Sequence, residues 1–162
     1  MAKPPKGEPV PDLRGEIWLP FPPTPKGRPR LGRRGAFTPQ KTVMAELNIR
    51  QYIAAHHLIS EPIPYPLSMV ISFYFENITV CHHAKRPDLD NLGKLVLDAL
   101  GPKITVTGGT RTQSKGILFN DDAQVCRLTL MKCCHPVKGI HIQWRTLGPL
   151  VDVGHPLDPR RK

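Results

Sequence analysis

The segment PLSMVISFYFE, residues 66–76, has the two-residue period of a β-strand with one buried face. Its large apolar side chains occupy alternate positions, namely Leu67, Met69, Ile71, Phe73 and Phe75. Successive side chains of a strand point to opposite faces, so these five would lie on the same face. We therefore expect a core strand here, in a sheet whose apolar face is covered by other elements.

A second segment, RPDLDNLGKLVLDAL at residues 86–100, has the period of an amphipathic helix. The helix is expected to run from Asp88 to Leu100, and Gly101-Pro102 would end it. The residues that follow the helical spacing and would form the buried face are Leu89, Leu92, Val96 and Ala99.

Four further elements are expected from periodicity and from the prolines and glycines between them. A strand is expected at residues 16–21, and a helix between Thr38-Pro39 and Pro62. The apolar residues assigned to one face of that helix are Val43, Leu47, Ala54 and Leu58. Two last strands are expected at 123–132 and 139–144, with alternating residues Cys126, Leu128 and Leu130 in the first and Ile140, Ile142 and Trp144 in the second. The order β-α-β-α-β-β predicts an α+β fold, a single mixed β-sheet with two helices packed on it.

The two ends of the chain are rich in proline, glycine and charge, and they lack apolar periodicity. We expect flexible tails at residues 1–13 and 146–162 and a single domain at 14–145. Residues 103–116 contain a β-like run and a Gly-Gly turn, which indicate an excursion or small hairpin outside the core.

The chain is basic, with 23 Lys and Arg against 13 Asp and Glu and a formal net charge of +10. Such an excess favours a polyanionic partner, and nucleic acid fits better than a membrane because no apolar run approaches the roughly 18 residues of a spanning helix. The N-terminus lacks the apolar region of a signal peptide, so we expect a cytoplasmic protein. The segment KGRPRLGRRGAFTPQK at 26–41 reads as a flexible basic arm. The cations expected to contact DNA are Lys26, Arg28, Arg30, Arg33, Arg34, Lys85 and Arg86.

Carboxylates are concentrated at two places in this basic chain. Asp90, Lys94 and Asp98 are spaced to lie on one face of the second helix, and Asp88 falls at its N-cap. A second acidic pair, Asp121-Asp122, precedes a strand that could bring it close to the first group. One interpretation is structural, with Asp88 as a cap and Asp90–Lys94 as a surface ion pair.

The other interpretation is a metal site, because up to four carboxylates at one point would repel unless a cation neutralised them. Oxygen ligands suit Mg²⁺ or Mn²⁺. Such ions promote in-line displacement at phosphorus, so the expected reaction is phosphodiester hydrolysis, with Lys94 contacting the scissile phosphate. The alternative is a non-catalytic nucleic-acid-binding protein.

Two clusters of soft ligands leave a zinc-stabilised form of that binding protein open. They are Cys81-His82-His83 and Cys133-Cys134-His135. Neighbouring residues of a strand point to opposite faces, which favours the simpler interpretation of free thiols beside exposed imidazoles.

The pattern D-L-D-N-x-x-K-x-x-x-D-A-L, from Asp88 to Leu100, followed by D-D-A-Q-V at 121–125, resembles RusA-type Holliday-junction resolvases. The segment PPTPKGRPRLGRRGAFTPQKT also resembles a basic block of that family. The resemblance implies a small α+β homodimer that binds four-way DNA junctions and makes paired nicks with Mg²⁺.

Transferred by position, the resemblance assigns metal binding to Asp88, Asp90 and Asp122 and an essential catalytic role to Lys94. It gives supporting roles to three further residues, Asp121, Asp98 and Asn91. The chain departs from compact members of the family in the glycine-rich excursion at 101–116, which would sit beside the site and alter substrate choice.

Overall fold

The structure, a computed structural model, describes residues 9–32, 35–76, 86–107 and 110–148. Its centre is a four-stranded sheet with strand order β1-β8-β4-β7. The strands are β1 (Arg14–Leu19), β4 (Leu67–Glu76), β7 (Val125–His135) and β8 (Gly139–Thr146). β7 runs parallel to β4 and the other neighbours are antiparallel, so the sheet is mixed as expected.

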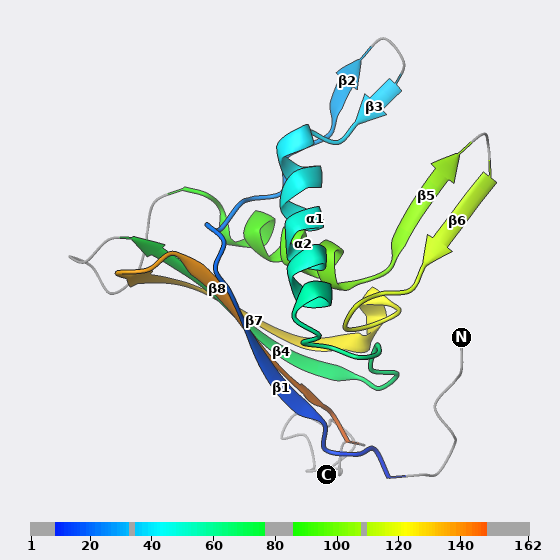
Figure 1. Cartoon of the computed structure of the whole chain (residues 1–162), viewed down its shortest axis with the longest axis vertical. Coiled ribbons are helices and arrows are strands. Elements are labelled where there is room, and N and C mark those ends of the chain that lie inside the picture. Colours follow the sequence, from blue (N-terminus) through cyan, green and yellow to red (C-terminus); the bar gives the residue numbers. More distant parts are fainter. Residues whose placement is uncertain (1–8, 33–34, 77–85, 108–109, 149–162) are drawn as a thin grey trace, which may run out of the picture.

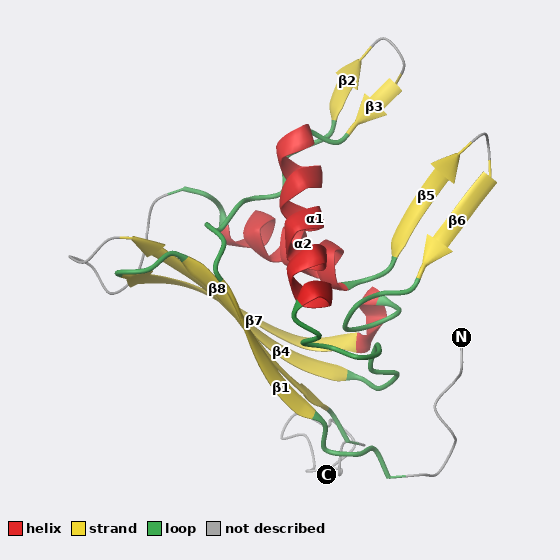
Figure 2. Ribbon diagram, viewed as in Figure 1, coloured by secondary structure: helices red, strands yellow, loops and turns green. Residues whose placement is uncertain are grey.

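Two helices, α1 (Gln40–Ala55) and α2 (Leu89–Leu100), lie on one face of this sheet (Figure 1 and Figure 2). With the four strands they follow the predicted order β-α-β-α-β-β. Outside the sheet are two hairpins, β2 (Arg30–Gly32) with β3 (Gly35–Phe37) and β5 (Lys103–Thr107) with β6 (Thr110–Ser114), and a short 3-10 helix, η1 (Asp122–Gln124). The β5–β6 hairpin confirms the expected excursion. The β2–β3 hairpin gives regular structure to part of the segment predicted as a flexible arm.

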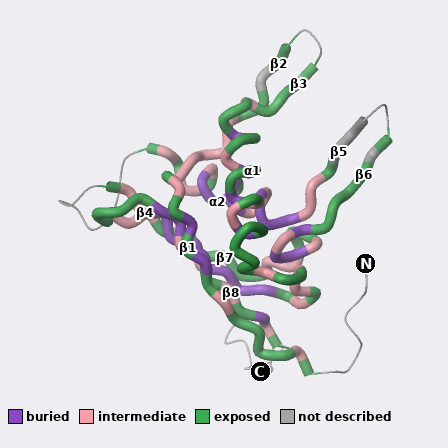
Figure 3. Tube along the Cα trace, viewed as in Figure 1, coloured by how far each residue is buried: buried purple, intermediate pink, exposed green. Residues whose placement is uncertain are grey.

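The core lies between the sheet and the helices, where the buried stretches of the chain meet (Figure 3). On β4 the predicted alternation is confirmed, because Leu67, Met69, Ile71 and Phe73 are all buried. On α2 the predicted face is confirmed by Leu92, Val96 and Ala99. A close approach is made at Gly93, where an added Cβ would lie 2.6 Å from Leu130 Cδ1 of β7. Glycine at this position lets α2 pack directly against the edge strand.

The buried face of α1 differs from the predicted one. Its buried residues are Thr42, Glu46, Ile49 and Ile53, whereas Val43 and Leu47, predicted to be buried, are exposed to 45% and 40%. α1 carries apolar residues on more than one side, so periodicity alone identifies its buried face poorly. Burial of Glu46 is possible because the Lys103 ammonium of β5 pairs with it. On β7, Cys126 lies at a register shift and is exposed. The prediction that it alternates in line with Leu128 on one face of the strand is therefore wrong.

α2 connects the parallel strands β4 and β7, which are neighbours in the sheet. In such a β-α-β connection the helix runs back along the sheet. The start of α2 therefore lies near the end of β4, and the end of α2 lies near the start of β7. With 12 residues, α2 separates these two places by about 18 Å.

Candidate active site

The polar face of α2 carries the predicted row of Asp90, Lys94 and Asp98. The opposite face of the helix is buried, so this row points away from the core. Lys94 Nζ lies 3.5 Å from Asp90 Oδ2, and both side chains are exposed, at 62% and 66%. An ion pair this exposed contributes little to stability. Both groups remain accessible to a substrate.

Asp88 occupies the N-cap position of α2, as predicted, but its carboxylate makes no capping hydrogen bond. The structural interpretation of this residue as a side-chain cap is therefore not supported. The chain just before it is held by β7, where the Lys132 ammonium donates to the Pro87 carbonyl at 3.3 Å.

A pocket of about 360 Å³ lies at the start of α2. Its lining combines carboxylates and cations: Lys26, Gly27, Arg28, Pro29, Asp88, Asp90, Asn91 and Lys94. Both helices hold the basic side of this pocket in place. The Lys26 backbone N–H donates to the Asn91 carbonyl of α2 at 2.9 Å. The Gly27 N–H donates to Thr42 Oγ1 of α1, also at 2.9 Å. This part of the basic segment is therefore ordered by the fold.

Lys26 also connects this pocket to a second acidic group near the other end of α2. Its ammonium forms an ion pair with the Asp98 carboxylate, and both side chains are about one-third exposed. Lys26 was predicted only as a DNA-binding cation, and the structure brings it among the carboxylates instead. In the sequence, only its place in the basic block PKGRPR marks Lys26 as a candidate. That block gives no indication of a partner 72 residues away.

Asp122 is the second carboxylate of this group. Partial burial raises the pKa of Asp122 above its ordinary value, the carboxylates of Asp98 and Asp121 raise it further, and the Lys26 ammonium lowers it. Asp122 Oδ1 lies against the end of α2, 3.0 Å from the position that a Cβ would take at Gly101. Nearby positive charge therefore stabilises the ionised form of Asp122.

Asp121 has a different environment, although it is the next residue. It is the N-cap of η1, where its Oδ1 accepts from the Ala123 N–H at 2.9 Å. The Gln124 side chain completes the capping box by accepting from the Asp121 N–H at 3.0 Å. Gln124 Nε2 also donates to the Ile63 carbonyl at 2.8 Å. Asp121 thus shapes the turn that presents Asp122.

Arg50 of α1 is a residue that sequence reasoning missed. Its guanidinium donates to the Asp98 carbonyl at 3.1 Å and also to the Gly101 carbonyl, so it binds the free carbonyls at the end of α2. Burial lowers the pKa of Arg50, opposed by the carboxylates of Glu46 and Asp98. No local pattern signals this contact, because it joins two helices that are far apart in the sequence.

The predicted gathering of four carboxylates at one point is not observed. Among the residues that the structure describes, no three His, Cys, Asp or Glu side chains stand close enough together to hold a metal ion. The β-α-β connection is the reason, because it places Asp88 and Asp90 at the start of α2 and Asp122 near its end. The donor chemistry of each group still suits a hard divalent cation, and positive charge near Asp122 would relieve its repulsion by Asp98 and Asp121.

The remaining predicted cations and soft ligands are only partly covered by the structure. Arg28 and Arg86 are exposed, and Arg30 begins β2. Arg33, Arg34 and Lys85 lie outside the described residues, as does the cluster Cys81-His82-His83.

On β7, burial raises the pKa of the Cys133 thiol, with Cys134 adding to the shift. Because Cys81, His82 and His83 lie outside the described residues, the zinc alternative stays a prediction.

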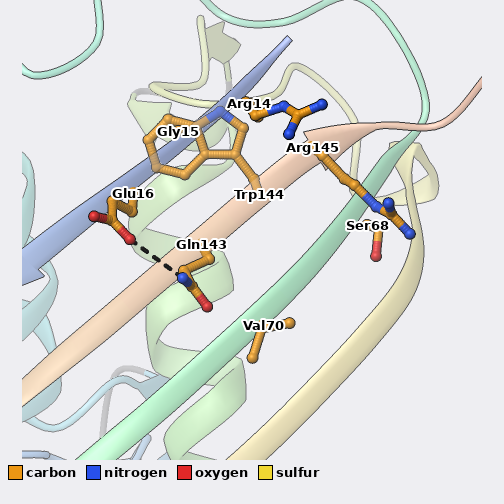
Figure 4. Close-up of a pocket in the computed structure, with 8 residues that line it drawn as sticks. All are labelled: Arg14, Gly15, Glu16, Ser68, Val70, Gln143, Trp144 and Arg145. Atoms are coloured by element: carbon orange, nitrogen blue, oxygen red, sulfur yellow. Dashed lines mark hydrogen bonds between the residues drawn. The ribbon is translucent and has the colours of Figure 1, made fainter. Parts of the chain in front are cut away.

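The opposite face of the sheet holds another pocket, of about 370 Å³, between β1, β8 and β4 (Figure 4). Arg14, Glu16, Val70, Gln143 and Arg145 are among the residues that line it, and Gln143 Nε2 donates to Glu16 Oε2 at 3.2 Å. None of the predicted catalytic residues lines it. The candidate active site is therefore the helical side of the molecule.

An α+β fold that places carboxylates and lysines side by side on a basic chain suits a hydrolase that cuts nucleic acid. A family model described as Endodeoxyribonuclease RusA matches residues 20–145, and the chain belongs to this family. The chain is thus an endodeoxyribonuclease, and membership of the family implies action on Holliday junctions. No curated protein matches the chain. No helix within the described residues is long and apolar enough to cross a membrane.

Proposed function

We propose that the protein resolves four-way DNA junctions by paired phosphodiester hydrolysis that requires Mg²⁺, with Mn²⁺ as a substitute. The observation that carries the proposal is the arrangement along α2. Asp88, whose side chain makes no capping hydrogen bond, and the exposed Asp90 line one pocket with Lys94 and Lys26. Lys26 also pairs with Asp98, and its charge lowers the pKa of Asp122. This membership of an endodeoxyribonuclease family argues against the non-catalytic alternative.

Asp88, Asp90 and Asp122 are the residues that would hold the metal. A bound divalent ion supplies an activated water and stabilises the charge that develops at phosphorus. Because Asp122 and the Asp88–Asp90 pair lie near opposite ends of α2, about 18 Å apart, side-chain rotation alone would not bring all three carboxylates onto one ion, and a shared site would require backbone movement. The chain's own cations have separate tasks. Lys94, which is exposed, contacts the scissile phosphate, while Lys26 offsets the negative charge of Asp98 and Asp122.

We also propose a homodimer. A four-way junction has near two-fold symmetry, and a two-fold dimer would present two equivalent sites to it. Support comes from three neighbouring apolar side chains on the uncovered side of α1, Val43, Met44 and Leu47, each at least 40% exposed. An apolar patch on a charged surface is typical of a protein interface.

The test compares wild type with Asp90→Asn on a labelled four-way junction, a fork and a linear duplex, each in Mg²⁺ and in EDTA. Paired nicks on the junction, seen only with wild type in Mg²⁺, are the expected result. Asp90→Asn is the appropriate variant because the side chain is exposed and its loss leaves the core unchanged. If the junction is bound by both proteins and cut by neither, the proposed function is wrong. If it is cut equally by both, the proposed catalytic role of Asp90 is wrong.

A further inference from the structure

The β5–β6 hairpin begins and ends beside the acidic group of Asp98 and Asp122. At its start, Gly101 lies against Asp122 Oδ1. At its end, the N–H groups of Ile117 and Leu118 donate to the Leu100 carbonyl of α2 at 2.8 and 3.0 Å. The hairpin therefore leaves the body of the protein at the same end of α2 where Lys26 pairs with Asp98.

The base of the hairpin is held firmly. Lys103, at the start of β5, pairs with Glu46 of α1, which is only 5% exposed. Leu118 and Phe119, just after the hairpin, are fully buried. Beyond this base the two strands extend past the helices and away from the sheet, and the β2–β3 hairpin extends toward the same end of the molecule (Figure 1). The fold thus directs both hairpins away from the core on the helical side.

The composition of the β5–β6 segment suits a polyanion. Residues 102–120 contain no acidic residue, and besides Lys103, which pairs with Glu46, they carry Arg111 and Lys115. The exposed side chains on and after β6 include Thr110, Thr112, Gln113, Ser114 and Lys115. Hydroxyl, amide and ammonium groups of this kind make most protein contacts to DNA phosphates. The segment of the other hairpin, residues 26–41, is likewise basic and free of acid.

We infer that the β5–β6 hairpin is a second DNA-binding arm, which contacts the phosphate backbone of a duplex arm of the branched substrate next to the active site. Together with the β2–β3 hairpin, it gives the enzyme two basic projections on the side of the molecule that carries the carboxylates. The inference rests on the proposed function, because the substrate is the branched DNA proposed above. It makes the hairpin a contributor to affinity rather than to the chemical step.

The hairpin can be removed without disturbing its base. Lys103 and Ser114 face each other in the β5–β6 register, so replacing residues 104–113 by Asn-Gly would join them through a two-residue turn. This variant keeps the Lys103–Glu46 ion pair. A second variant, Arg111→Ala with Lys115→Ala, keeps the hairpin and removes two charges. The matched control is Lys138→Ala, in the turn between β7 and β8, where Lys138 pairs with Glu76.

Binding of a four-way junction is measured for each variant in the Asp90→Asn background, from low to high salt. Both hairpin variants should bind more weakly near 0.15 M salt, by about tenfold in the double substitution. The log–log salt slope should fall by roughly 0.9 for each lost contact between a cation and a phosphate, which is about 1.8 in the double substitution and about 0.9 in the shortened variant, where only Arg111 is lost. The Lys138→Ala control should bind as its parent does. Affinity and slope unchanged in both hairpin variants would overturn the inference.

Nicking separates this inference from the proposed function. With Asp90 present, the shortened variant should still cut the junction at low salt and saturating protein, because the carboxylates and Lys94 are retained. If the shortened variant binds weakly while wild type cuts nothing, the arm is supported and the proposed function fails. If the variant binds normally and wild type cuts, the proposed function stands and the arm is wrong.

Discussion

Asp121 and Asp122 are adjacent in the chain, yet the fold gives them different tasks. The Asp121 carboxylate takes part in the capping box of η1, whereas the pKa of Asp122 responds to the charges of Asp98 and Lys26. A carboxylate whose pKa is raised is less stable in its ionised form when the protein is folded. Asp122 therefore carries a cost in stability that a purely structural residue would not have, which is typical of functional sites.

Asp122→Asn should reduce the rate of nicking by about 100-fold or more. It should also raise the thermal stability of the metal-free protein at pH 7. A raised folded pKa means that the favourable contribution of the protonated form is present at low pH and is lost as pH rises through the folded pKa. The gain in Tm of Asp122→Asn over wild type should therefore be larger at pH 7 than at pH 3. Calorimetry of both proteins at the two pH values measures this gain, and an equal gain in Tm at both would contradict the prediction.

Lys26→Met should raise the pKa of Asp122 further, because Lys26 is the cation that lowers it. Nicking should fall about tenfold near neutral pH, and the acid limb of its pH profile should move to higher pH. Carboxyl NMR titration of the metal-free protein measures the pKa directly. Lys41→Met, on an exposed residue of α1, is the control. An unchanged Asp122 titration would mean that Lys26 acts only on DNA.

At the scale of elements, the site depends on how α2 is held at both of its ends. Lys132 of β7 binds the Pro87 carbonyl at the start, and Arg50 of α1 binds the carbonyls of Asp98 and Gly101 at the end. Gly93 lets the middle of the helix approach Leu130. The position of the carboxylates is thus fixed by tertiary contacts of the helix.

Arg50→Met should destabilise the protein by about 1–3 kcal/mol, the range for loss of a hydrogen bond from a charged group to a partly buried partner. The apolar methionine keeps much of the packing volume, so the loss reports mainly on the hydrogen bonds to α2. Urea unfolding gives the free energy. Arg145→Met, on the exposed far face of the sheet, should change it by less than about 0.5 kcal/mol. Equal stability of Arg50→Met and wild type would show that the end of α2 needs no such support.

At the scale of the whole molecule, the two faces of the sheet carry different groups. The helical side carries the acidic groups, the basic segment at 26–29 and both hairpins (Figure 1). The far side carries a pocket without predicted catalytic residues. Substrate contacts are therefore expected on one side only.

Light scattering of the purified protein should give a mass of twice 18.1 kDa, the value for one chain. Leu47→Glu should shift the equilibrium toward the monomer, since it places a charge among exposed apolar residues of α1. Leu31→Glu, on the highly exposed β2, is the control and should leave the mass unchanged. A monomer at micromolar concentration for wild type would contradict the proposed dimer.

Sequence by itself determined the features that depend on local periodicity. The alternation of β4, the buried stripe of α2 and the row of Asp90, Lys94 and Asp98 were predicted correctly, because neighbours along a strand or helix have fixed relative directions. Motif spacing also identified the family. Only the tertiary structure decided the buried face of α1, the pairing of Lys26 with Asp98, and the separation of Asp122 from Asp88. These depend on which strands pair and on the direction of the helix between them, and contacts between distant residues leave no periodic signal in the chain.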